Sequence, residues 1–364
     1  MLTDILIISF LIAGFVCGLV ALCYAEFASS MPIAGSTYTY SRATLGETVA
    51  WMVGWTLMLE YALGAAAISV GWSAYLQSLL SGFGLGLPTA LMAAPGALPG
   101  SSTWFNLPAF ILIFLLTAML ARGVQKSKRL ANVLVAVKIG VILLFLFSGA
   151  QHVEVENWQP FMPLGTAGVI SAAALVFFTY IGFDVVSAAA EEVKRPGRDL
   201  PIGIIGTLIV CALLYAAVAA VMTGIVPYHE FLGINNPISL ALQHAGENWI
   251  GSFIDAGAIL GMLTSVLFIL YALARLVFAM SRDQLLPQSL SAVDPKRHTP
   301  LQATCSTGLV SALIAALVPL NVLAELISIA TLAVFMVVAI AVITLRKTHP
   351  ELPRIFLCPA VPWI

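Results

Sequence analysis

Two basic side chains stand inside long apolar stretches of a chain that is 60% hydrophobic and only 9% charged. Lys138 lies about eight residues, or roughly 12 Å along a helix, from the polar boundary near Leu130. From that depth in the hydrocarbon, a lysine side chain is barely long enough to bring its amine to water. Lys138 is therefore either a functional amine or a structural amine that hydrogen-bonds backbone carbonyls. Arg275 cannot lose its proton, which favours a fixed ion pair or a side chain that extends to the interface.

Four acidic residues also lie within or at the edges of apolar stretches. Asp255 and Glu325 fall near the ends of their stretches, where solvation or the first turn of a helix accounts for the charge. Glu60 lies about 13 residues into a long apolar stretch and is a candidate cavity or gating residue. Asp184 belongs to the segment described next and is a candidate of the same kind.

The segment 173–184 reads AALVFFTYIGFD and combines bulky aromatic residues, a glycine and an aspartate. Membrane transporters commonly interrupt a helix at such a place, where freed carbonyls and helix ends bind the substrate. Asp184 could then accept the unpaired N–H groups of the following helix. The alternative is a continuous helix that carries an aromatic stripe and one paired acid.

Several other classes of protein have little support. The 16 Lys and Arg residues balance 17 Asp and Glu, which argues against a nucleic-acid partner. None of the five histidines lies well inside an apolar stretch, and the sequence contains neither HExxH nor GxSxG. The five cysteines have no CxxC spacing and are interpreted as apolar packing residues. We therefore expect no enzyme, no metal site and no cofactor.

These residues must be positioned by membrane-spanning helices, because so few charges cannot cover a water-exposed surface. A helix needs about 20 apolar residues to cross the hydrocarbon, where an open backbone has no partners. We predict an all-α polytopic membrane protein with a single membrane domain over 1–364. The predicted spans are nine, roughly 5–28, 47–80, 104–121, 130–149, 168–190, 202–226, 250–281, 301–319 and 322–345.

The basic residues follow this division closely. All except Lys138 and Arg275 fall in alternate connections between the predicted spans, while the connections around 81–103, 150–167 and 227–249 contain no Lys or Arg. The positive-inside rule then places the basic connections in the cytoplasm. Residue 1 would then lie on the side of the membrane opposite the cytoplasm, although the sequence has no signal peptide. We therefore expect a preceding helix and interpret the sequence as a fragment.

Several motifs resemble the amino acid–polyamine–organocation superfamily of permeases, particularly its bacterial branch similar to cationic amino acid transporters. The motifs lie on six parts of the chain. They are LCYAEFA at 22–28 with PIAGSTYTY at 32–40, LGE at 45–47, GW at 54–55 with LEY at 59–61, FFTYIGFD at 177–184, EEVKRPGRDLP at 191–201, and AMSRD at 279–283 with LP at 286–287.

The resemblance implies a broken-helix fold with an inverted repeat of five plus five helices, of which the nine spans are the second to tenth. The first helix, which binds the substrate carboxylate in that family, would precede this sequence. By the same likeness, carbonyls at Phe178, Thr179 and Ile181 receive the substrate amine, with Phe178 as a lid. Lys138 matches the lysine that replaces a sodium ion in proton-coupled members.

The sequence thus favours a secondary amino acid permease of the cell membrane, driven by protons and working by alternating access. Its partners would be an amino acid, the proton and the lipid bilayer. A membrane receptor or accessory subunit that binds amino acids without transport is the alternative, together with an inactive fragment.

Overall fold

Helices account for nearly all of the regular structure in the described part of the chain. The computed structural model describes residues 4–31, 36–82, 84–98, 100–123, 128–159, 165–180, 182–183, 186, 193–231, 237–295, 297, 299–351, 355–359 and 361. No strand occurs among these residues. Because an α-helix satisfies its own backbone groups, this architecture suits hydrocarbon.

The helices follow the apolar stretches of the sequence. Asn106 shows how one of them begins: its side chain accepts a hydrogen bond from the Ala109 N–H, and Pro108 follows in the first turn. The α-helices are α1 Asp4–Ser30, α2 Ser36–Leu45, α3 Glu47–Gly82, α4 Leu107–Ala121, α5 Lys128–Gly149, α6 Gly165–Val176, α8 Pro196–Ile225, α9 Pro237–His244, α10 Asn248–Arg282, α11 Leu301–Leu317 and α12 Leu320–Thr348.

Each predicted span contains a helix, but these helices differ in length. By length and composition, six are able to cross a membrane: 6–30, 47–81, 132–152, 196–225, 249–282 and 320–348. Three apolar helices, α4, α6 and α11, are shorter. The all-α polytopic class is confirmed, while nine spans and the inverted repeat stay predictions. The short helix α2 was not predicted, because its polar sequence was assigned to a connection.

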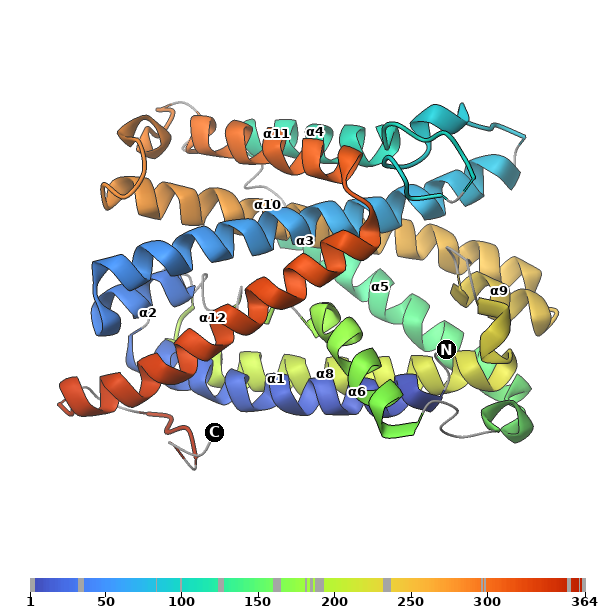
Figure 1. Cartoon of the computed structure of the whole chain (residues 1–364), viewed down its shortest axis with the longest axis horizontal. Helices are drawn as coiled ribbons and strands as arrows, with labels where there is room; N and C mark the ends of the chain where they lie inside the picture. Colours follow the sequence, from blue (N-terminus) through green and yellow to red (C-terminus); the bar gives the residue numbers. More distant parts are fainter. Residues whose placement is uncertain are drawn as a thin grey trace.

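The long helices lie roughly side by side, and α12 crosses them obliquely (Figure 1). Helix α1 packs along α8, α3 along α10, and α4 along α11. At Gly14 a side chain would find no room, since a Cβ there would lie 2.9 Å from the Tyr180 hydroxyl and 3.2 Å from the Ala212 Cβ. A glycine at this position therefore allows close packing between α1, α8 and Tyr180, which follows α6.

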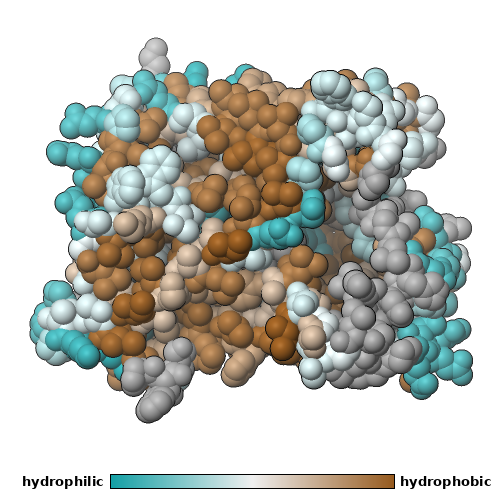
Figure 2. Space-filling model, in the orientation of Figure 1, coloured by the Kyte–Doolittle hydropathy of each residue, from teal (hydrophilic) through white to brown (hydrophobic). Residues whose placement is uncertain are grey.

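The basic connections gather at one end of the helices, called the basic end below. Arg42 contacts Asp283, Arg297 donates to the Ala121 carbonyl, and Arg346 contacts Glu26. At the other end, the Asn106 N–H donates to Ala316 and the Glu154 N–H to Gly224. In Figure 2, hydrophobic residues cover the middle of the visible face and hydrophilic ones its left and right margins. This surface matches a protein that crosses a bilayer along the horizontal direction of the view.

Candidate functional site

A cavity of about 520 Å³ lies between the long helices. Residues of α3, α5, α8, α10 and α12 line it, together with Thr179, Tyr180, Gly182 and Phe183, which follow α6. Most of its wall is apolar, with Met262, Phe268 and Ile327 as large members. Lys138 is the one charged side chain among the described residues that line this cavity.

Lys138 reaches this cavity from α5. Its Nζ donates a hydrogen bond of 3.0 Å to the Ser265 hydroxyl on α10. The lysine stem lies against Gly261, where a Cβ would be 3.1 Å from the Lys138 Cγ. Because Gly261 and Ser265 are four residues apart on one helix face, the glycine admits the stem and the serine receives the amine. Lys138 is thus fixed in place by α10.

The helix that starts at Gly165 does not continue through the predicted fifth span. Helix α6 ends at Val176, the 3₁₀ turn η4 covers Phe177–Tyr180, and Gly182 has φ +115°. That φ favours glycine, because a side chain would collide with the backbone there. Of the two interpretations left open by the sequence, the described residues agree with the interrupted helix.

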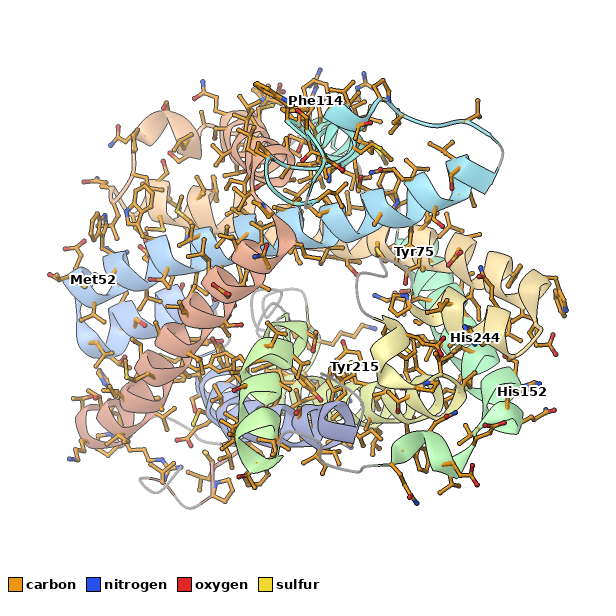
Figure 3. All side chains as sticks on the ribbon, turned by 45° about the vertical axis from the view of Figure 1, so that its right-hand side comes forward. Met52, Tyr75, Phe114, His152, Tyr215 and His244 are labelled. Carbon is orange, nitrogen blue, oxygen red and sulfur yellow. The ribbon has the colours of Figure 1, made fainter. Side chains whose placement is uncertain are left out.

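Two tyrosines hold the interrupted segment in place. The Tyr215 hydroxyl, from α8, donates to the Thr179 carbonyl at 3.3 Å. The Tyr180 hydroxyl donates to the Phe10 carbonyl of α1 at 2.7 Å. The two tyrosine rings also meet edge to face, with centroids 5.3 Å apart. Tyr215 is labelled near the centre of Figure 3 and lines the cavity.

The predicted substrate-binding residues are only partly described. Thr179 lines the cavity, and its hydroxyl donates to the Val176 carbonyl at 2.6 Å. Phe178 lies in η4, but its side chain is outside the described part of the chain, as are Ile181 and Asp184. Glu60 is buried on α3, with 2% of its surface exposed, and is not among the described residues that line the cavity. The roles assigned to these five residues stay predictions.

Sequence reasoning missed several polar residues of the cavity. Tyr215, Cys211 and Thr207 come from α8, and Ser265 comes from α10. Each is a single polar or sulfur-containing residue within an apolar helix. A helical face joining residues 207, 211 and 215 was the available signal, because residues four apart share one side.

The surroundings of two other charged residues, Arg275 and Asp255, indicate structural rather than functional roles. Arg275 is exposed, and its guanidinium lies 4.9 Å from the ring centroid of Tyr271, one turn earlier. Asp255 is 8% exposed, so its interpretation as a solvated boundary residue was wrong. Its interpretation as a charge in the first turn of a helix was also wrong, because α10 begins at Asn248 and has no acidic residue in its first turn.

The basic end holds two groups of charged side chains. In the first, Glu26 is fully buried and accepts two hydrogen bonds from Arg346, at 2.9 and 2.6 Å. In the second, Asp283 accepts a hydrogen bond from the Tyr38 hydroxyl at 2.8 Å and pairs with Arg42 at 2.6 Å. Burial, with the hydrogen bond to Asp283, raises the pKa of Tyr38. These contacts join α1 to α12 and α2 to α10.

Helices that are apolar over membrane-spanning lengths, a central cavity and an interrupted helix together define a polytopic membrane transporter rather than an enzyme. The sequence profile of the amino acid permease family matches residues 2–364. The chain belongs to the amino acid permease family, within the amino acid–polyamine–organocation superfamily. It is a multi-pass protein of the cell membrane.

Individual relatives cover most of the chain. A branched-chain amino acid permease of Bacillus subtilis is 55% identical over 359 residues, which are 99% of this chain and 77% of that protein. A methylthioribose transporter of the same organism is 52% identical over 357 residues, covering 98% and 77%. The vacuolar cationic amino acid transporter 4 of Arabidopsis thaliana is 37% identical over 352 residues, covering 95% and 58%.

Proposed function

We propose that this permease carries neutral, apolar α-amino acids by alternating access and couples their movement to protons at Lys138. The observation that carries the proposal is the Lys138–Ser265 hydrogen bond in a cavity with an otherwise uncharged described lining.

Proton coupling is supported by the partner of Lys138. A serine hydroxyl accepts a hydrogen bond from an ammonium group and can instead donate one to a neutral amine. Lys138 can therefore gain and lose a proton without losing its contact with Ser265. Among the described residues, the structure records no ion pair that would hold Lys138 permanently charged. An arginine at this place could not fill the role, because its guanidinium stays protonated.

A neutral side chain on the substrate is supported by the cavity wall. No Asp or Glu lies among the described lining residues, so a cationic side chain would be desolvated without a partner. Met262, Phe268 and Ile327 instead offer apolar surface. The substrate ammonium group would bind carbonyls near the interruption, by likeness to the family. The branched-chain permease at 55% identity agrees with a substrate of this size and polarity.

Alternating access is supported by the interruption after Val176. A helix that is broken near its middle can bend there while both halves stay hydrogen-bonded. The Tyr215 and Tyr180 hydroxyls bind this segment to α8 and α1 through single hydrogen bonds, which can exchange with water or substrate.

A second substrate class has a specific observation in its favour, the 52% identity to a methylthioribose transporter. Thr207, Tyr215 and Ser265 line the cavity, and their hydroxyls could bind sugar hydroxyls, while the apolar wall would receive a methylthio group. We rank this class second because the family profile is that of amino acid permeases and the branched-chain amino acid permease has the higher identity, 55% against 52%.

Uptake of labelled leucine into proteoliposomes tests the proposal. We expect uptake to be stimulated by an inward proton gradient, to be inhibited by excess isoleucine and valine, and to resist excess lysine or methylthioribose. Lys138→Ala should abolish the stimulation. Lys347→Ala, at an exposed basic residue on α12, serves as the matched control and should keep it.

Three results would count against the proposal. Gradient-stimulated uptake in Lys138→Ala equal to that of the unchanged protein would remove Lys138 from proton coupling. Inhibition by methylthioribose but by no amino acid would assign the sugar class. Leucine binding without uptake would indicate a receptor rather than a transporter.

A further inference from the structure

A clasp of hydrogen bonds closes the basic end between α1 and α12. Glu26 accepts two hydrogen bonds from Arg346 and a third, of 2.8 Å, from the Cys358 N–H. The Arg346 Nη2 also donates to the Cys358 carbonyl at 2.7 Å. Both backbone polar groups of Cys358 are therefore held by one buried ion pair, which fixes the segment 355–359 against α1.

This clasp brings two thiols together. Cys23 lies three residues before Glu26, so both side chains leave α1 on one face. The Sγ atoms of Cys23 and Cys358 are 3.8 Å apart, and each of these residues is 2% exposed. A disulfide needs the sulfurs at about 2.05 Å. Closing the remaining gap takes side-chain rotation and a small movement of segment 355–359, which has no helix to resist it.

We propose that Cys23 and Cys358 form a reversible oxidation site, at which a peroxide converts the two thiols into a disulfide that locks the clasp. The site joins residues 335 positions apart in the sequence, and neither is needed for the cavity described above. The consequence for transport rests on the proposed function, whereas formation of the disulfide does not.

The reaction balances with one equivalent of peroxide. The Cys358 thiolate attacks a peroxide oxygen and forms a sulfenic acid while water leaves. The Cys23 thiol then attacks that sulfur, forming the S–S bond and releasing a second water. Two thiols and hydrogen peroxide thus give one disulfide and two waters, and a dithiol reductant reverses the product by exchange.

The surroundings of Cys358 favour it as the first thiol to react. The hydrogen bond from Cys23 lowers the pKa of Cys358, which outweighs the opposing effect of burial. The thiolate is the reactive form, and a lowered pKa increases its share. In the cytoplasm, where the positive-inside rule places this end, disulfides are typically transient and regulatory.

Locking the clasp would restrain α1. Helix α1 packs along α8 and receives the Tyr180 hydrogen bond at Phe10, so it is joined to the interrupted segment. If alternating access moves α1 relative to α12, a covalent link from Cys23 to the chain beyond α12 opposes that movement. We therefore expect oxidised protein to transport more slowly.

The test combines mass spectrometry with uptake on the same proteoliposomes. After graded hydrogen peroxide and alkylation of the remaining thiols, digestion should yield Cys23 and Cys358 peptides joined with the loss of two hydrogens. Uptake should fall in proportion to the joined fraction and return after reduction. Cys23→Ser and Cys358→Ser should each abolish both the joined peptide and the reversible loss of uptake.

Two other cysteines supply matched controls. Cys17 is 1% exposed on α1, and Cys305 is exposed on α11. Cys17→Ser and Cys305→Ser should leave the reversible inhibition intact. Oxidation of Cys305 without any joined Cys23–Cys358 peptide would overturn the proposal, as would complete joining with unchanged uptake. Because joining is scored by mass, it is measured even in protein that fails to transport leucine, so the two proposals fail separately.

Discussion

Replacing Glu26 by glutamine removes a buried charge while it keeps the size of the side chain. Glu26 is fully buried, and its two oxygens accept three hydrogen bonds. A glutamine amide has one oxygen and one NH₂ group, and the NH₂ group cannot accept. In either amide orientation at least one donor of Arg346 or Cys358 is left facing another donor.

The size of the effect follows from those lost partners. A hydrogen bond to a charged group contributes about 1.5–3 kcal/mol, and breaking a buried ion pair costs about 3–5 kcal/mol. The Arg346 side chain is 27% exposed, so water recovers part of its solvation. We therefore expect Glu26→Gln to lower the free energy of unfolding by about 2–4 kcal/mol.

Denaturant unfolding of the purified protein in detergent measures this difference. Glu47→Gln is the matched control, because Glu47 is 63% exposed and lies 3.7 Å from Arg42. An exposed pair of this kind contributes about 0.2–1 kcal/mol. If Glu26→Gln were no more destabilising than Glu47→Gln, the clasp would not stabilise the fold, and the reasoning from burial and hydrogen bonding would be refuted.

Other predictions concern the lysine site and the tyrosine at the basic end. In Gly261→Ala the new Cβ would crowd the Lys138 stem, so stimulation of leucine uptake by a proton gradient should fall while the helix stays intact. Gly206→Ala, on α8 with no atom within 4 Å of the added Cβ, should keep it, and equal stimulation in the two variants would contradict the packing argument. The raised pKa of Tyr38 means that the folded protein keeps a proton that the unfolded chain loses above about pH 10. The contribution of Tyr38 to the free energy of unfolding should therefore be complete below about pH 10 and fall as the pH rises further. Tyr38→Phe should weaken that fall in alkaline unfolding curves, as should loss of the Asp283 carboxylate. An unchanged pH profile in Tyr38→Phe would exclude Tyr38 as the source of the fall.

The class of fold could be predicted from composition alone. With 9% charged residues, only a chain surrounded by lipid can bury its apolar surface, and lipid permits helices because they satisfy their own backbone. The alternation of basic connections also predicted which helix ends lie together, as the contacts of Arg42, Arg297 and Arg346 illustrate. The prediction that Lys138 is functional rests on the cost of a charge in an apolar stretch, and Lys138 lines the cavity.

The partners of these residues were decided only in three dimensions. Apolar periodicity places Lys138 on a helix, but it carries no information that Ser265, 127 positions away, receives its amine. Tyr215 and Thr179 meet because α8 packs beside the interrupted segment, and neither residue type signals that contact. Cys23 and Glu26 belonged to one recognisable motif, yet their shared partner at Cys358 is distant in sequence. Hydrophobicity dictates which residues become helix, because that choice is local. Which polar atoms then meet depends on how whole helices pack, and only the tertiary structure fixes it.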